Sequence, residues 1–216
     1  MNFAVPELFS DRREAGRLLG ERLKHLSGEN PLVIGLPRGG VIVAAEIADV
    51  LGAELDVIVP AKIGAPGNPE LAVGAVMEDG SVYLNEDIVG WYGVDEEYIK
   101  RAVGFQMEKI RRRVEAYRKV KERVPVEGRC VILTDDGVAT GATMKSAVKW
   151  ASSRSPSRVV IALPVGPEDT IRELSSMADE VICLKVPPFF SAVSQFYIEF
   201  DQVGDEEVIE VLKGHS

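Results

Sequence analysis

Cysteine and histidine are scarce in this chain of 216 residues, which has two of each. No Cys-x-x-Cys pair occurs, and His25 and His215 stand far apart, so neither a zinc cluster nor a histidine-dependent triad is expected. Each cysteine, Cys130 and Cys183, lies in or beside an apolar run. We interpret both as strand residues of a protein from a reducing compartment, in preference to a disulfide or a metal site.

The chain also lacks an excess of positive charge, a long apolar run and an amino-terminal signal pattern. Lysine and arginine number 25 against 34 aspartates and glutamates, a formal net charge of −9. This balance argues against a general nucleic-acid-binding protein. No apolar stretch approaches the ~20 residues that span a bilayer, and no charged-then-apolar leader opens the sequence. We therefore expect no nucleic-acid partner, no membrane partner, and a soluble cytoplasmic protein.

What the sequence does contain is a regular alternation of helical and strand-like patterns. This alternation predicts an α/β fold, with a mostly parallel sheet and helices on both faces. Strands are expected over residues 32–36, 55–59, 129–134, 159–163 and 180–186, and helices over 10–28, 41–51, 140–152, 168–177 and 201–212. Ser10 is the expected N-cap of the first helix. A hairpin over 71–84 and a long basic helical stretch over 95–123 complete the pattern.

The most informative segment runs from Val131 to Thr143 with the sequence Val-Ile-Leu-Thr-Asp-Asp-Gly-Val-Ala-Thr-Gly-Ala-Thr. An apolar strand ends in two carboxylates, and a turn of small and hydroxylated residues leads into a helix. Backbone N–H groups and the Thr140 and Thr143 hydroxyls at a helix N-terminus suit a phosphate. Asp135 and Asp136 can accept hydrogen bonds from two vicinal hydroxyls. Together these groups predict a site for a ribose 5-phosphate; the plain alternative is a strand-to-helix turn with Thr140 as N-cap.

A second candidate site is the turn Gly-Leu-Pro-Arg-Gly-Gly over residues 35–40. Ligands of open α/β sheets bind at the carboxyl ends of strands. Glycines there allow close backbone approach, and Arg38 offers forked donors to phosphate oxygens. The turn could also hold a solvated arginine, or bind a dinucleotide with Asp56 as its acidic partner, although Pro37 then replaces the second glycine. A Walker-type phosphate loop is excluded, because Lys145 falls outside its required register.

The order of apolar strand, Asp-Asp, three residues and Thr-Gly-x-Thr resembles the signature of type I phosphoribosyltransferases, which bind phosphoribosyl pyrophosphate (PRPP). The resemblance covers nearly the whole chain for a microbial subgroup of this family. Its pattern comprises Asp11-Arg12 near the start, the Leu-Pro-Arg-Gly-Gly and Lys-Ile-Gly-Ala-Pro-Gly-Asn-Pro-Glu motifs, and a late Phe-Phe…Tyr stretch. It implies one domain over residues 1–216, with a core of roughly 29–186. A small hood subdomain would be formed by 187–216 and the amino-terminal helix, and 95–123 would be a helical insertion.

The resemblance also implies roles for individual residues. The PRPP-binding loop would comprise Asp135, Asp136, Gly137, Val138, Ala139, Thr140, Gly141, Ala142 and Thr143. Pyrophosphate would be held by Arg38, Gly39 and Gly40, in a loop that often contains a cis peptide, and by Lys62 after the second strand. Arg38 and Lys62 are the residues expected to act in catalysis, although Lys62 could also be a surface lysine. Residues 63–70 would form a mobile loop that closes over the ligands.

The activity that the resemblance implies is transfer of the 5-phosphoribosyl group from PRPP to a nucleobase or related nitrogen acceptor, with release of pyrophosphate. Mg²⁺ is the implied cofactor, held mainly by ligand and water with indirect help from Asp135 and Asp136. Purine-salvage members carry aspartate where this chain has Ala139, which argues against a 6-oxopurine acceptor. The alternatives are a non-catalytic PRPP- or nucleotide-binding regulator on the same fold, and a hydrolase that uses water as acceptor.

The carboxy-terminal part of the chain is rich in aromatic residues. Phe189, Phe190 and Tyr197 are candidates for stacking on the acceptor, as in the hood of type I enzymes, or for packing back onto the core. The basic run Arg111-Arg112-Arg113 is either a solvated helix face or a contact for a phosphate or a partner. The resemblance also implies a homodimer, and the sequence alone assigns no interface to it.

Overall fold

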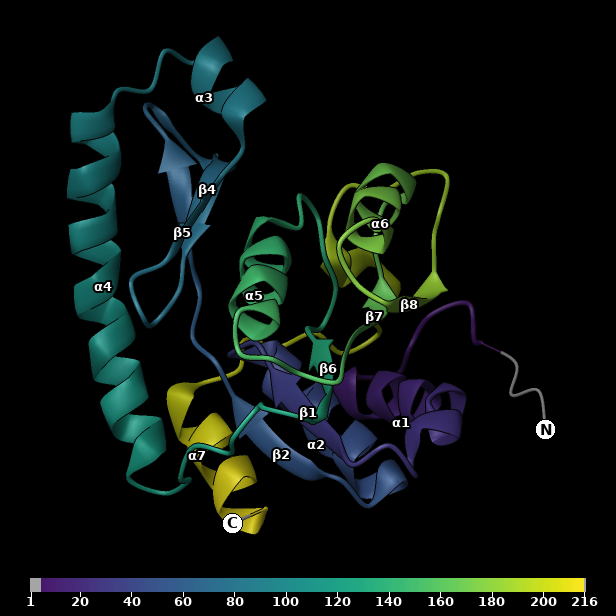
Figure 1. Cartoon of the computed structure of the whole chain (residues 1–216). Coiled ribbons are helices and arrows are strands. Elements are labelled where there is room, and N and C mark those ends of the chain that lie inside the picture. Colours follow the sequence, from purple (N-terminus) through teal and green to yellow (C-terminus); the bar gives the residue numbers. More distant parts are fainter. Residues whose placement is uncertain (1–4, 216) are drawn as a thin grey trace.

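A five-stranded parallel sheet lies at the centre of the computed structural model, which describes residues 5–215 apart from the side chain of Glu70 (Figure 1). The strand order is β2-β1-β6-β7-β8. The strands are β1 (Pro31–Gly35), β2 (Glu54–Val57), β6 (Cys130–Thr134), β7 (Arg158–Val165) and β8 (Glu180–Lys185). The last residues of β1 and β6, Gly35 and Thr134, pair with each other, so the two candidate loops leave the sheet side by side. The predicted α/β class and mostly parallel sheet are confirmed.

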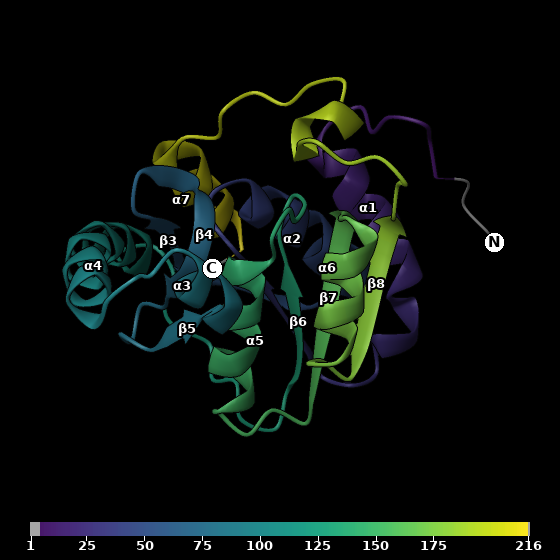
Figure 2. The same cartoon turned by 90° about the horizontal axis from the view of Figure 1, so that it is seen from above.

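Helices cover both faces of this sheet because its strands are apolar on both faces (Figure 2). On one face, α1 (Arg12–Arg22) and α2 (Gly39–Leu51) form a common core with Val33 and Ile132. On the other, α5 (Ala142–Ser152) and α6 (Glu168–Ser175) pack with Ile34 and Leu133. Neighbouring residues of one strand thus serve opposite cores, as the two-residue period of a strand requires.

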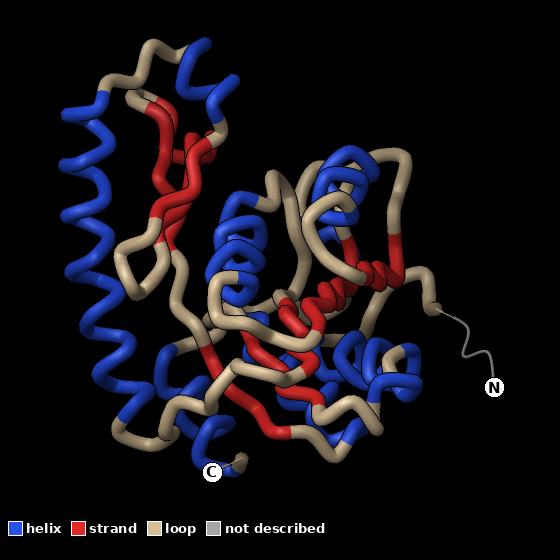
Figure 3. Tube along the Cα trace, viewed as in Figure 1, coloured by secondary structure: helices blue, strands red, loops and turns tan. Residues whose placement is uncertain are grey.

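A second, antiparallel sheet stands apart from the parallel one (Figure 3). It contains β3 (Ala61–Ala65), β4 (Asn68–Val76) and β5 (Val82–Leu84), and is followed by α3 (Glu86–Trp91) and α4 (Glu96–Arg118). Pairing of β4 with β5 confirms the hairpin expected over 71–84. The prediction of an irregular loop over residues 63–70 is wrong, because β3 and β4 form a hairpin there with Ala65 paired to Asn68. Ile63 and Ala65 are buried in the main core, which outweighs the local turn preference of the Gly/Pro-rich sequence.

Helix ends differ from the predictions by a few residues. Asp11, and not Ser10, caps α1: its Oδ1 accepts the Glu14 N–H at 2.8 Å. Helix α5 begins at Ala142, because Gly141 takes the N-cap position in the left-handed conformation in place of Thr140. The last helix, α7, spans Asp205–Gly214 and not 201–212.

The carboxy-terminal segment returns across the sheet to the amino-terminal one. After β8 the chain passes through a 3₁₀ turn, Val193–Phe196, and a β-bridge then joins Phe9 to Tyr197. The Phe9 N–H donates to Phe196 O at 2.9 Å, and the Ile198 N–H donates to Phe9 O at 2.8 Å. Helix α7 then packs on α2 and α4. The segment around Tyr197 therefore lies beside the segment around Phe9, just before α1.

Neither membrane spanning nor disulfide bonding is seen over residues 5–215. No helix in this range is both long enough and apolar enough to cross a bilayer. Cys130 is buried in β6 and Cys183 is half-buried in β8, and both are free thiols. The interpretation of both cysteines as strand residues is confirmed.

Candidate functional site

The carboxylate pair lies where β6 ends, at the carboxyl edge of the parallel sheet. Thr134 closes the strand and is fully buried, and the half-buried Asp135 and Asp136 follow it. The Asp136 N–H donates to Asp135 Oδ1 at 2.8 Å. The Asp136 carbonyl accepts the Tyr197 hydroxyl at 2.6 Å, which anchors the backbone of this turn to the carboxy-terminal segment.

The turn after β1 packs directly against these carboxylates. Its Pro37–Arg38 peptide is cis, and α2 begins at Gly39. A methyl group on Gly39 would overlap Asp136 Oδ2, and one on Gly40 would lie 2.7 Å from the Asp135 Cα. Glycine is required at both positions because the two loops approach each other backbone to side chain.

Arg12 brings a cation to the carboxylates from the amino-terminal helix. Its Nε donates to Asp136 Oδ2 at 2.7 Å, and its Nη1 donates to the Asp201 carbonyl at 2.9 Å. The guanidinium carbon lies 3.8 Å from the centroid of the Phe200 ring. This stacking and the fork of donors fix the guanidinium plane between the carboxylate pair and the carboxy-terminal segment.

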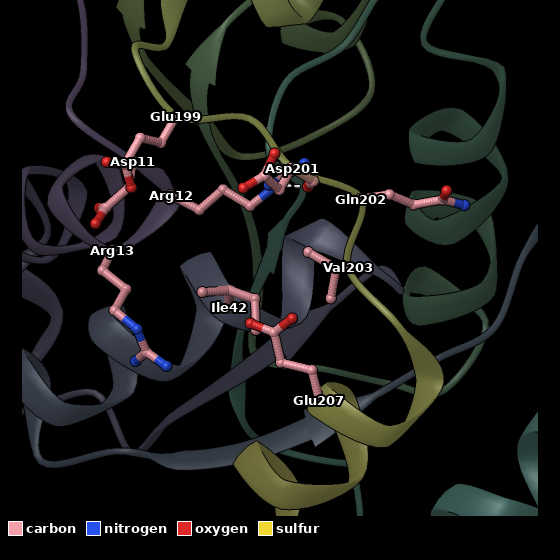
Figure 4. A pocket seen from close by; sticks show the side chains of 9 residues that line it. All are labelled: Asp11, Arg12, Arg13, Ile42, Glu199, Asp201, Gln202, Val203 and Glu207. Carbon is pink, nitrogen blue, oxygen red and sulfur yellow. Dashed lines mark hydrogen bonds between the residues drawn. The ribbon is translucent and has the colours of Figure 1, made fainter.

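These loops surround a cavity of about 420 Å³. It is lined by Arg12, Pro37, Arg38, Gly39, Asp135, Asp136, Phe200, Asp201, Gln202 and Val203. A smaller cavity of about 180 Å³ adjoins it on the other side of Arg12, between α1, α2 and the start of α7 (Figure 4). Charged and polar groups therefore converge at the carboxyl ends of adjacent parallel strands, where α/β proteins hold their ligands.

Burial and mutual repulsion disfavour the charged forms of the two carboxylates. The pKa of Asp135 is raised well above its usual value, first by burial and then by the charge of Asp136. Burial also raises the pKa of Asp136, and the hydrogen bond and charge of Arg12 oppose this rise. Adjacent carboxylates that are so poorly solvated gain from any ligand that donates hydrogen bonds to them or brings positive charge.

The loop from Gly137 to Thr143 links this pair to α5. Val138 N–H donates to Val165 O at 3.0 Å, and the Thr170 hydroxyl donates to Ala139 O at 2.7 Å, so β7 and α6 hold the loop from behind. Ala139 and Thr140 are exposed, and Thr143 is half-buried in the first turn of the helix. The loop is thus exposed at Ala139 and Thr140, just before the start of an eleven-residue helix, whose first backbone N–H groups have no partner within the helix.

Asp56 does not belong to this site. It is 2% exposed in β2, where its Oδ1 accepts from Arg118 Nη1 at 2.6 Å and its Oδ2 accepts from the Val124 N–H at 3.0 Å. Its carboxylate ties the end of α4 to the sheet. The dinucleotide interpretation of the first turn required a ligand-facing acidic residue here, and the burial of Asp56 rules it out.

Comparison with known proteins assigns the family. The family model described as the phosphoribosyl transferase domain matches residues 11–201, a range that contains Arg12, both loops and Asp201. The chain belongs to this family. The membership predicted from the Asp-Asp and Thr-Gly-x-Thr pattern is confirmed.

Two relatives of this phosphoribosyl transferase domain show how far the similarity extends. A curated protein from Mycobacterium tuberculosis strain H37Rv, whose name marks it provisionally as a phosphoribosyl transferase, is 45% identical over 206 residues. That match covers 95% of this chain and 46% of the relative, so the chain spans about half the length of the curated relatives it matches. The crystal structure of TT1426 from Thermus thermophilus is 45% identical, with a TM-score of 0.83 over 97% of this chain and 99% of that one.

Some residues predicted for the phosphoribosyl transferase site lie away from the cavity. Lys62 is in β3 of the small sheet, paired with Ala75, and does not line the cavity. Phe189 is 86% exposed, and Phe190 stacks on Phe196 with ring centroids 5.7 Å apart. The ring of Tyr197 is buried, and its hydroxyl is used by the Asp136 carbonyl. In this arrangement none of the three predicted aromatic residues offers a free face to a ligand in the cavity.

Five residues that line the cavity were not predicted as site residues from the sequence: Arg12, Phe200, Asp201, Gln202 and Val203. Phe200 lines the cavity and is the aromatic residue that meets Arg12. The Arg12 contacts join positions 124 and 189 residues apart, so no local motif reveals them. Two signals were usable: the family resemblance includes the Asp11-Arg12 pair, and it placed the amino-terminal helix in the hood.

Proposed function

We propose that the protein binds PRPP together with Mg²⁺ and transfers its 5-phosphoribosyl group to a nitrogen acceptor, releasing pyrophosphate. The observation that carries this proposal is the approach of Gly39 and Gly40 to Asp135 and Asp136 across one cavity. A loop suited to pyrophosphate and a carboxylate pair suited to a diol then lie on opposite sides of a single ligand. Family membership supports phosphoribosyl transfer in general.

Each part of PRPP has a matching group in this site. Asp135 and Asp136 would accept hydrogen bonds from the two ribose hydroxyls. These hydrogen bonds would compensate for the burial that raises the pKa of Asp135. The N–H groups of residues 137–143, with the hydroxyls of Thr140 and Thr143, would hold the 5-phosphate. Arg38 and the backbone of Gly39 and Gly40 would hold the pyrophosphate.

Two cations have distinct places in the proposal. Arg12 neutralises Asp136 and leaves the second oxygen of this carboxylate for the ligand. Lys62 is proposed as a second pyrophosphate contact, which requires the small sheet to approach the cavity when ligands bind. Displacement at the anomeric carbon would then depend on positioning and on stabilising the leaving pyrophosphate.

The residues at the cavity are compatible with a Mg²⁺ ion that the ligand itself would mainly coordinate. Asp135 and Asp136 are hard oxygen donors, and no third acidic, histidine or cysteine side chain completes a metal cluster within residues 5–215. Mg²⁺ commonly binds through one or two carboxylates plus substrate phosphates and water. When bound, it would neutralise charge on the pyrophosphate that separates.

The acceptor in this proposal is a nucleobase or a related nitrogen compound. Ala139 carries no carboxylate, so a 6-oxopurine that needs a proton acceptor there is disfavoured. Phe200, and none of the three predicted aromatic residues, is the aromatic residue that lines the cavity, and Arg12 covers one of its faces. From the family resemblance we also propose a cytoplasmic homodimer that serves nucleotide metabolism.

The test is Mg²⁺-dependent pyrophosphate release from PRPP with a panel of purine and pyrimidine bases and a no-base control. Release with one base and not without it would establish a transferase and name its acceptor. Calorimetric binding without release would favour a PRPP-binding regulator on the same fold, and release without a base would favour a hydrolase. Arg38→Ala should abolish release, whereas Arg17→Ala, which removes only an exposed contact to Glu46, should not. The absence of both PRPP binding and pyrophosphate release would overturn the proposal.

A further inference from the structure

One face of α4 is packed and the opposite face has no partner within the described chain. On the packed face Ile110 and Tyr117 are buried, and Tyr98 and Gln106 donate hydrogen bonds to backbone carbonyls of β3 at 2.8 and 3.0 Å. In both views α4 forms the outer edge of the molecule (Figures 1 and 2). The outer face of α4 is therefore exposed and accessible to another molecule.

Gly104 lies near the middle of this outer face. It is exposed, and a methyl group placed on it would meet no atom within 4 Å. Glycine is among the poorest residues for a helix interior, and nothing in the described chain packs closely enough to require it here. A small residue on an exposed helix face allows the close approach of a second helix. Its neighbour Phe105 is 61% exposed, with Lys109 Nζ 4.2 Å from the centroid of its ring, so apolar surface borders the face of Gly104.

The charges along this face are arranged symmetrically about Gly104. Residues four positions away on either side are Lys100 and Glu108, and residues seven positions away are Glu97 and Arg111. All four are exposed, and steps of four and seven keep them on the face of Gly104. If two α4 helices pack antiparallel about a two-fold axis at Gly104, each residue meets the one equidistant from the axis. Both resulting pairs then have opposite charges.

Within one chain, the charged residues of this face form only weak ion pairs. Lys100 and Arg101 reach Glu96 and Glu97 at 3.6 and 3.5 Å, in exposed contacts that add little to stability. Over the described residues, Glu108 and Arg111 form no ion pair. Trp91, 81% exposed, lies a few residues before α4 and would come beside the carboxyl-terminal half of the partner's helix.

We propose that two copies of this chain associate through the outer faces of α4, antiparallel about a two-fold axis that passes beside Gly104. Such an isologous contact is self-complementary, because each acidic residue of one copy meets a basic residue of the other. It uses the segment that type I relatives do not need for a minimal fold, and no residue of α4 lines the cavity at the carboxylate pair.

The first test is the mass of the protein in low-salt buffer, by sedimentation or light scattering, at about 100 µM. The proposal predicts twice the 23.5 kDa of the chain. Gly104→Arg should give the single-chain mass, while its circular dichroism should stay that of the folded wild type, because arginine favours a helix and a Cβ at this position meets no atom within 4 Å. Gly28→Arg is the matched control: a Cβ there also meets no atom within 4 Å, the position lies outside α4, between α1 and β1, and the variant should remain dimeric.

The second test examines the register of the contact. Lys100→Glu and Glu108→Lys should each weaken the dimer by roughly tenfold at low salt, because each places like charges opposite one another. The double variant should recover most of the affinity, since the pair is restored with its signs exchanged. A wild-type monomer at 100 µM, a Gly104→Arg variant that stays dimeric, or a double variant as weak as the sum of the single variants would overturn the proposal.

Discussion

Two aspartate–arginine pairs in this protein are alike in composition and differ in their surroundings. Asp56 and Arg118 join the end of α4 to β2, and fixed donors meet both oxygens of Asp56: Arg118 and the N–H groups of Val57 and Val124. Asp136 and Arg12 form a similar bond at 2.7 Å. Asp136, however, stands beside a second carboxylate and faces a cavity. A buried carboxylate whose two oxygens both accept from fixed donors of the protein supports the fold, whereas a crowded pair of carboxylates at a cavity is suited to a ligand.

The largest effect that this comparison predicts is on stability. Asp56→Ala should lower the free energy of unfolding by roughly 3–5 kcal/mol, because it leaves the Arg118 guanidinium partly buried without its carboxylate. Urea denaturation measures this change. Asp169→Ala removes an exposed aspartate–arginine contact of 3.1 Å and should change the free energy of unfolding by less than about 1 kcal/mol. A stability loss of the same size in both variants would contradict the structural role of Asp56.

A smaller effect is expected on ligand affinity when the two loops of the cavity are forced apart. Gly39→Ala places a methyl group against Asp136 Oδ2 and Arg12 Nε, so the carboxylate must shift. Displacement of a binding group by about 1 Å commonly costs up to ~100-fold, and we expect PRPP affinity to fall by about 10- to 100-fold. The measurement is calorimetric titration. Gly28→Ala, where a methyl group meets nothing, should bind as the wild type does.

The smallest effect concerns pH. Because the pKa of Asp135 is raised in the folded protein by burial and by Asp136, its ionisation opposes folding. The stability of the ligand-free protein should therefore decrease as pH rises from about 4 through the folded pKa. Asp135→Asn removes this contribution, so the variant should melt at a higher temperature than the wild type at about pH 7. The difference should shrink toward about pH 4. A variant that melts lower at neutral pH would show that the charged side chain stabilises the fold.

The sequence predicted those parts of the site whose chemistry is local. Asp135, Asp136 and the Leu36–Gly40 turn were found because strand, carboxylates, glycines and threonines stand at short, fixed spacings. The parallel sheet followed from apolar strands alternating with helical patterns. Arg12 and Phe200 were not assigned to the site. They lie beside the carboxylates only because the fold brings together segments that are far apart in the sequence.

The points that the sequence left open or missed had the same physical origin. Two alternatives stood for Tyr197, stacking on an acceptor and packing onto the core, because a sequence does not say which aromatic residue of a group will be buried. In the structure Phe9 and Phe200 enclose its ring. Residues 63–70 have the composition of a loop. Burial of Ile63 and Ala65 in the main core instead draws them into a strand, and no local pattern records that contact.

Titration of PRPP and Mg²⁺ into the wild type and into Asp135→Asn combined with Asp136→Asn tests the central claim most directly. The account predicts that the wild type binds, and that the double variant stays folded and loses at least about 100-fold in affinity, because both acceptors of the ribose hydroxyls are gone. Unchanged affinity in the folded double variant, or no binding by the wild type, would show that the carboxylate pair at the end of β6 is not a PRPP site.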